Sequence, residues 1–118
     1  MRRDMASWME TISSIRAVVF EEAGAYAAQC LDYDIAAQAA SLIDLHQELA
    51  RVLTVHVAAS YELKQEPFSK LGPAPERFWH AYETGTRLET EGVSFSLSSG
   101  QLMPRIRADM RLAPSLAV

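Results

Sequence analysis

A long amphipathic helix is the feature that most restricts how this chain can fold. Its predicted start is Ser41, whose side chain can accept from free N–H groups of a first turn that also contains Asp44. Its predicted end is about Lys64, because Pro67 disfavours helical backbone in the residue before it. A helix with one long apolar side has to cover another layer, and we expect that layer to be a sheet. The apolar side consists of Leu42, Leu45, Leu49, Val52, Leu53, Val57 and Leu63.

The residues ahead of this helix alternate between two faces, which is typical of strands. Residues 15–20 are rich in β-branched and aromatic side chains, which favour a strand. A turn is predicted at 21–24, where Gly24 can adopt positive φ. Further strands are predicted at 25–31 and 35–40. We therefore expect a three-stranded antiparallel meander that leads into the long helix, in the order β-β-β-α.

The second half of the chain predicts a short helix and a hairpin. Residues 72–75 are the most loop-like run, and Pro75 suits the first turn of a helix that Gly85 ends. Beyond this helix, residues 93–98 and 102–112 each alternate apolar and polar side chains, with a Ser-Gly turn between them. The pattern predicts a β-hairpin with one buried face.

Together these elements predict a single α+β domain, in which the long helix crosses an antiparallel sheet and the hairpin adds strands to it. With 118 residues and 49% hydrophobic content, the chain has enough material for one modest core. The predicted segments of this 1–118 domain are a helical arm at 1–14, a β-β-β-α core at 15–64, a loop and short helix at 65–92, and the hairpin at 93–113.

Composition excludes several classes of protein. The net charge of −4 and pI of about 5.3 argue against a protein whose whole surface binds nucleic acid or an anionic membrane. Cys30 is the only cysteine, so neither an internal disulfide nor a multi-cysteine zinc site can form. This cysteine usage fits a reducing compartment, and we expect a cytoplasmic protein. No window reaches the roughly 18 apolar residues of a membrane span, and the N-terminus lacks the apolar run of a signal peptide.

Carboxylates and the cysteine are the first candidates for chemistry. Glu21, Glu22, Asp32 and Asp34 lie in a short stretch, and paired acids can divide acid and base roles or bind a hard cation. In a tight meander, however, these acids fall at strand ends, where water solvates them. Cys30 needs a nearby base or a positive helix end to become a nucleophile, and in an alternating strand we expect it to be a small core residue.

The histidines give no metal site. His46 and His56 both belong to the long helix, but ten residues separate them by about 15 Å along its axis, so one ion cannot join them. His80 is predicted to be a surface residue of the second helix. The chain contains no glycine-rich phosphate loop and no HExxH or GxSxG motif. We therefore expect no catalytic residue, no metal and no cofactor, and we interpret the protein as not being an enzyme.

Arginines on the last predicted strand are the best local indication of a binding surface. Arg105, Arg107 and Arg111 share one face, interrupted by Asp109. Such a stripe can contact phosphates or an acidic partner. The alternative interpretation is a solvated outer face of the sheet.

The meander and the start of the long helix resemble the N-terminal domain of the HicB-like antitoxin family. The resemblance covers about residues 15–60 and rests on VVFEEAG, AYA, AQCL, DIAAQA and SLIDL in that order. It implies a small α+β domain, similar to a partly degraded double-stranded-RNA-binding fold, that forms dimers or larger oligomers. Typical members bind a small HicA-type ribonuclease toxin and carry a separate DNA-binding module, which we do not identify after Lys64. The family's usual Pro-Glu-Leu-x-Gly turn is replaced here by Leu31-Asp32-Tyr33-Asp34.

The resemblance implies a non-enzymatic oligomer that sequesters a small basic toxin-like ribonuclease. An acidic net charge would favour this encounter electrostatically. The alternative is a stand-alone oligomeric domain that binds RNA or a small ligand, with the three arginines as contacts. The size of the chain also leads us to expect an oligomer. Several large aromatic side chains lie on short elements outside the main sheet and helix, and one small core does not easily bury them all. These aromatic residues are Trp8, Phe78, Trp79, Tyr82 and Phe95.

Overall fold

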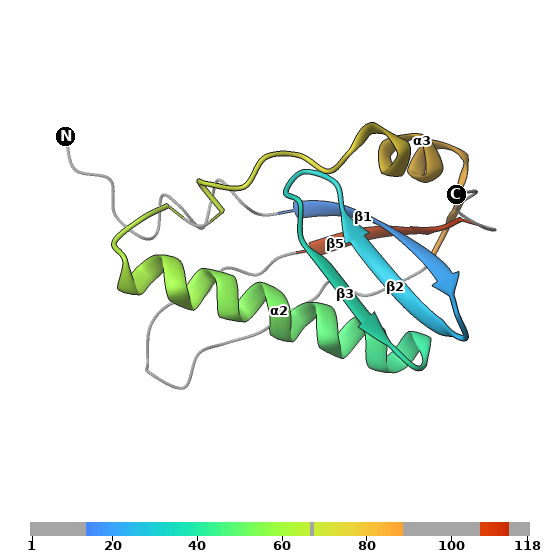
Figure 1. The fold of residues 1–118 in the computed structure, drawn as a ribbon, viewed down its shortest axis with the longest axis horizontal. Helices are drawn as coiled ribbons and strands as arrows, with labels where there is room; N and C mark the ends of the chain where they lie inside the picture. The colour runs from blue at the N-terminus through green and yellow to red at the C-terminus, as the bar shows by residue number, and fades with distance from the viewer. Residues whose placement is uncertain (1–13, 67, 89–106, 114–118) are drawn as a thin grey trace.

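The computed structural model describes residues 14–66, 68–88 and 107–113. Within them, five strands form one sheet in the order β3-β2-β1-β5-β4, and two helices pack against it (Figure 1). The elements are β1 (Ser14–Glu22), β2 (Ala25–Cys30), β3 (Ala36–Ala39), α2 (Leu42–Glu62), α3 (Glu76–Thr84), β4 (Thr86–Arg87) and β5 (Arg107–Leu112). The predicted α+β class is confirmed, and so is the long helix that packs on the sheet.

The predicted meander is present. β1 pairs antiparallel with β2, and β2 pairs antiparallel with β3. The β1–β2 turn contains Ala23 at φ 53° and Gly24 at φ 82°, the two positive φ values that match a tight turn to the right-handed twist of a hairpin. β3 is shorter than predicted and covers residues 36–39.

The expectation of a wholly antiparallel sheet is wrong at β5. This strand runs parallel to β1, with Ser14 opposite Arg107 and Val19 opposite Leu112. Its antiparallel partner among the described residues is β4, which was not predicted. Parallel pairing requires a long crossover, and the segment that contains α2 and α3 supplies it. The first strand and turn of the predicted hairpin, and nearly all of the predicted N-terminal arm, lie outside the described residues.

The start of α2 follows the predicted capping chemistry. Ser41 has extended backbone, and its Oγ accepts from the Asp44 N–H at 3.1 Å. Asp44 also places a negative charge in the first turn, where the helix dipole is positive. The helix ends at Glu62, slightly before the predicted Lys64, which itself has φ 55°.

The buried side of α2 differs from the predicted stripe at both ends. Leu42 is 41% exposed and Leu63 is 66% exposed, whereas Tyr61, which we did not include, is buried. A step of four residues turns about 40° beyond one full turn, so a row of this spacing winds around the helix. The buried side chains follow that row: Leu45, Leu49, Leu53, Val57 and Tyr61.

The sheet is covered on both faces. On the α2 face, alternate residues of β1, β2 and β5 are buried against the helix. On the other face, α3 and the segment before it bury Val18 and Leu31 completely. Each such side chain contributes roughly 1.5–3 kcal/mol when fully buried. The second core consists of Val18, Leu31, Ala74, Phe78, Ala81, Tyr82 and Ala113.

α3 begins directly after Pro75 and ends at Gly85, as predicted. Gly85 has φ −82°, so its role is not a left-handed conformation. A Cβ at this position would lie 3.1 Å from the carbonyl oxygens of both Ala81 and Leu112. The glycine therefore allows the end of α3 to approach β5 closely.

Candidate functional site

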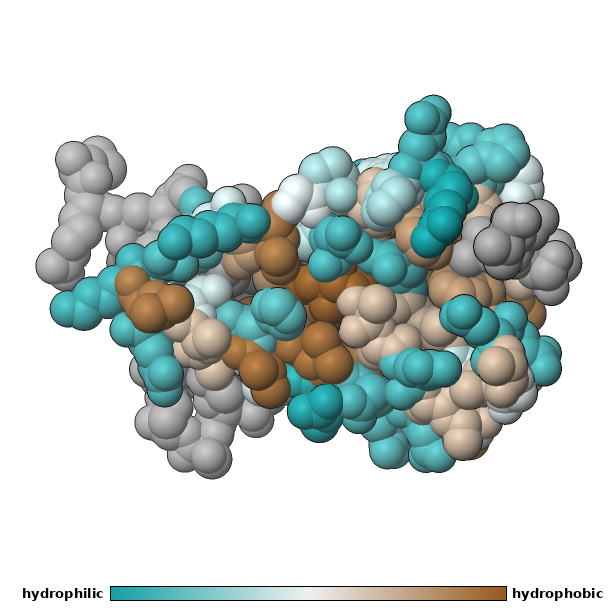
Figure 2. Space-filling model, in the orientation of Figure 1, coloured by the Kyte–Doolittle hydropathy of each residue, from teal (hydrophilic) through white to brown (hydrophobic). Residues whose placement is uncertain are grey.

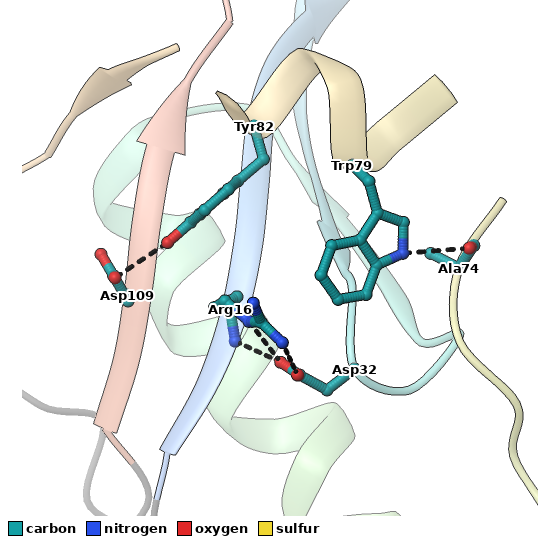
Figure 3. Close-up of polar contacts among 6 residues, drawn as sticks. All are labelled: Arg16, Asp32, Ala74, Trp79, Tyr82 and Asp109. Atoms are coloured by element: carbon teal, nitrogen blue, oxygen red, sulfur yellow. Dashed lines mark hydrogen bonds and ion pairs between the residues drawn. The ribbon is translucent and has the colours of Figure 1, made fainter. Parts of the chain in front are cut away.

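A polar layer lies between α3 and the sheet. It consists of Arg16, Asp32, Trp79, Tyr82, Asp109 and Arg111, and we call these six residues the α3 polar layer. Figure 3 shows how side chains from β1, from the loop after β2, from α3 and from β5 point toward one another in it. No other cluster in the described residues joins so many elements through charged and aromatic groups, which makes it the candidate site.

The first half of the layer is an ion pair under an indole ring. Arg16 Nη2 lies 2.6 Å from Asp32 Oδ1, and the Arg16 backbone N–H donates to Asp32 Oδ2 at 2.8 Å. The guanidinium stacks over the Trp79 ring at 4.6 Å from its centroid, a favourable cation–π position. Trp79 is itself held by its Nε1–H, which donates to the Ala74 carbonyl at 3.2 Å.

This ion pair shifts the pKa of both Arg16 and Asp32. Partial burial of Asp32 raises its pKa, but the hydrogen bonds and the charge of Arg16 outweigh that effect and hold the pKa below its ordinary value. The hydrogen bond to Asp32 raises the pKa of Arg16. The Arg16 side chain is 48% exposed, so the pair remains accessible from water.

The second half of the layer is built around Tyr82. Its hydroxyl donates to Asp109 Oδ2 at 2.8 Å, and burial, followed by this hydrogen bond, raises the pKa of the phenol. Arg111 stacks over the same ring at 4.2 Å, and its Nη1 donates to the Tyr82 carbonyl at 3.3 Å. Arg111 Nε is buried and has no hydrogen-bond partner in the described part of the chain.

The layer is suited to recognition and positioning. It offers two arginines on aromatic rings and two carboxylates, in a setting that is partly open to water. Guanidinium groups in this arrangement can bind carboxylate or phosphate, although each already has an internal partner. The same contacts hold α3 against β1 and β5, so the layer also stabilises the packing of α3 on the sheet.

The predicted arginine stripe is only partly described. Arg111 belongs to the α3 polar layer, Arg107 is the first residue of β5, and Arg105 lies outside the described residues. Sequence reasoning missed Arg16, although strand alternation places it on the same face as Val18. Its pairing with Asp32 carries no sequence signal, because the two residues meet only when β1 and β2 are aligned.

The four predicted acids do not form one cluster. Asp32 binds Arg16, and Asp34 accepts from Gln29 Nε2 at 2.8 Å. Glu21 and Glu22 are exposed at the β1–β2 turn. They lie at the end of the fold where β2 and α2 begin (Figure 1). In the residues that the structure describes, no three His, Cys, Asp or Glu side chains are grouped so that they could hold a metal ion.

Cys30 and the histidines are separated from one another. Cys30 is completely buried on the α2 face, and burial raises the pKa of its thiol to about 12, so it is not an activated nucleophile. His46 and His56 are half-buried on α2, and the His56 ring lies 6.3 Å from that of Phe68. His80 is exposed on α3, as predicted.

Comparisons with protein-family models, with curated proteins and with solved structures found no match. Neither helix in the described ranges combines the length and apolar content that crossing a bilayer requires.

Proposed function

We propose that this protein is a non-enzymatic, HicB-like antitoxin-type protein that forms dimers or larger oligomers and sequesters a small basic toxin-like ribonuclease in the cytoplasm. The observation that supports this most is the β-β-β-α order of residues 14–62, which coincides with the stretch that resembles the family. The helix begins at the quoted SLIDL, with Ser41 as its cap.

The acidic end of the fold supports a basic partner. Glu21 and Glu22 are exposed on the β1–β2 turn, and Asp44 is exposed in the first turn of α2. Opposite charge on a partner would speed association, and this effect weakens as salt rises. We therefore assign the first contact with the ribonuclease to this end.

The test combines affinity capture with an activity assay. Tagged protein is expressed in its source organism, and a small basic protein recovered in stoichiometric amount is purified and assayed for RNA cleavage. The expected result is cleavage by the captured protein alone and loss of cleavage when one equivalent of the tagged protein is added.

A matched pair of variants distinguishes binding at the acidic end from non-specific electrostatic binding. Glu22→Lys and Glu62→Lys change the net charge equally, and both positions are exposed. Glu22→Lys should slow association with the captured ribonuclease by at least about threefold at low salt, while Glu62→Lys should leave it unchanged. A captured protein that does not cleave RNA, or whose cleavage continues at full rate in the complex, contradicts the proposal.

A second candidate is a stand-alone oligomeric domain that binds RNA or a small ligand. The observation that favours it is that Arg111 pairs with Val18 in register, which places Arg111 on the same sheet face as Arg16. Binding of labelled single-stranded RNA, measured by fluorescence anisotropy, should then fall steeply with salt and weaken on Arg105→Ala and Arg107→Ala substitution. RNA binding that these substitutions leave unchanged would exclude Arg105 and Arg107 as contacts.

A further inference from the structure

The first turn of α2 presents two adjacent apolar side chains to water. Ile43 is 75% exposed, the largest fraction among the exposed large hydrophobic residues of the described ranges, and Leu42 is 41% exposed. The buried row of the helix begins only at Leu45, so neither residue belongs to it. Apolar side chains stabilise a fold by being buried, so these two contribute little in that way. We call Leu42 and Ile43 the α2 apolar pair.

An acidic rim lies at the same end of the fold, where β2 and α2 begin (Figure 1). Glu21 is in register with Tyr26, and Tyr26 is in register with Ala39. Two strand spacings, about 10 Å, therefore separate Glu21 from the end of β3, where the chain turns toward α2. Cross-strand neighbours share a face, and Tyr26 packs against the core under α2, so Glu21 is on the face that α2 covers. The acidic rim consists of Glu21, Glu22 and Asp44, all exposed.

The acidic rim has no counter-charges of its own. Residues 17–50 contain six acids and no lysine or arginine. Three of these carboxylates have partners, which are Arg16 for Asp32, Gln29 for Asp34 and Arg51 for Glu48. The other three form the acidic rim, and no ion pair within the described residues involves them. The negative charge at this end is therefore available to a partner.

The charge of the rim selects the kind of partner that fits. Protein interfaces combine an apolar centre with a polar rim, as this end of the molecule does. RNA does not fit here, because its phosphates would face carboxylates. A second copy docked by a two-fold axis does not fit either, because such an axis brings the same patch of both chains together and sets acid against acid. A basic surface with an apolar side chain among its lysines and arginines matches both the apolar pair and the acidic rim.

From these observations we propose that the α2 apolar pair is the anchor of the surface that binds the ribonuclease. An apolar side chain of the basic protein packs on Ile43 and Leu42, and the lysines or arginines around it lie against the acidic rim. The inference rests on the proposed function for the identity of the partner. It adds the residues that hold the complex together after the first electrostatic contact.

The first test separates the anchor from the rim by their kinetic effects. Opposite charges mainly raise the association rate, whereas a buried apolar anchor mainly lowers the dissociation rate. Ile43→Ala should therefore raise the dissociation rate constant of the captured ribonuclease by at least about tenfold and change the association rate constant by less than about twofold. Glu22→Lys should mainly lower the association rate constant. Surface plasmon resonance at two salt concentrations measures both constants.

Val55→Ala is the matched control for Ile43→Ala. Val55 is also β-branched, is 55% exposed and lies about three turns further along α2. Figure 2 shows apolar side chains along the course of α2 toward its C-terminal end. The control removes a comparable exposed apolar group far from the acidic rim, so it should leave both rate constants unchanged. Ile43→Ala itself should keep the melting temperature of the free chain within about 2 °C, because alanine favours helix and the side chain that it replaces is mostly exposed.

The second test needs no ribonuclease. The isotope-labelled full chain is titrated with two synthetic peptides of equal charge, Lys-Lys-Leu-Leu-Lys-Lys and Lys-Lys-Ser-Ser-Lys-Lys, both blocked at their ends, and NMR follows the backbone amide signals. The leucine peptide should shift the signals of residues 42–44 and bind at least about fivefold more tightly than the serine peptide, because only it buries apolar surface. Ile43→Ala should remove this difference.

Three results would overturn the inference. One is an unchanged dissociation rate constant on Ile43→Ala, which would leave charge alone as the source of the affinity. The second is equal binding of the two peptides, or shifts confined to another surface. The third is self-association of the wild-type chain that Ile43→Ala abolishes, which would assign the apolar pair to a second copy. Failure to capture a ribonuclease contradicts the proposed function instead, and the peptide titration then decides the inference by itself.

Discussion

Substituting alanine for each of three glycines tests the packing of α3 against β5. Gly85→Ala has an allowed backbone conformation, and it gains about 0.4–1 kcal/mol because alanine restricts the unfolded chain. The new Cβ, however, would lie 3.1 Å from two backbone carbonyl oxygens and 3.2 Å from Arg111 Cβ. Overpacking of this kind costs about 1–3 kcal/mol. The net expectation is a loss of about 1 kcal/mol in the free energy of unfolding.

The other two glycines provide the comparison. A Cβ at Gly72 would have nothing within 4 Å, so Gly72→Ala should be neutral or stabilise the fold by up to about 1 kcal/mol. Gly24 has equally open surroundings but a φ of 82°, so Gly24→Ala should cost about 1–2 kcal/mol through backbone strain alone. The three substitutions thus separate the effects of crowding, open space and backbone conformation.

Urea denaturation followed by circular dichroism measures all three variants. With an m value of about 2 kcal/mol/M, Gly85→Ala should lower the unfolding midpoint by about 0.5 M without changing m. Equal stability of the Gly85→Ala and Gly72→Ala variants would refute the close approach of α3 to β5. A lower midpoint with a changed m value would instead indicate an altered unfolded state.

Three further outcomes are expected. The folded state holds the pKa of Asp32 below its ordinary value of 3.8, so the Asp32 carboxylate stabilises the fold above that pH, and this stabilisation is lost as the pH falls through the lower, folded pKa. In pH-dependent melts, Asp32→Asn should therefore lower the stability at pH 7 and reduce the further loss of stability below about pH 4. Cys30, buried with a pKa of about 12, should react with a thiol reagent only at the rate of unfolding, whereas immediate labelling at pH 8 would contradict its burial. Leu53→Ala should cost about 2–5 kcal/mol by chemical denaturation, while Val55→Ala at concentrations where the chain is monomeric should change stability by less than about 0.5 kcal/mol.

The parts of the fold that depend on neighbours in sequence were predictable. Strand alternation before residue 40 and the Ser41 cap involve groups within a few residues of each other, so local propensity decides them. The end of α3 at Gly85 was predicted for a different reason from the one observed. A helix-ending glycine is usually explained by positive φ, whereas this one is required by the backbone of β5.

The candidate site was much less predictable, because tertiary contacts create it. Arg16 and Asp32 meet through the β1–β2 register, and Tyr82 meets Asp109 only after β5 is placed beside β1. The exposure of Leu63 has a similar origin, since a helical projection treats the apolar side as straight and the sheet covers it along a winding row. The spacing of apolar residues predicts neither these tertiary contacts nor the exposure of Leu63.

The position of β1 between β2 and β5 has a consequence for synthesis of the chain. β1, β2, β3 and α2 lie within the first 62 residues, whereas β5 begins at Arg107. On the ribosome, the meander and its helix can therefore form while the outer edge of β1 still lacks its neighbour. That edge belongs to a strand with the completely buried residues Ala17, Val18 and Val19, and an open apolar edge is a template for pairing with other chains. Pairing of β5 with β1 is the step that closes this edge.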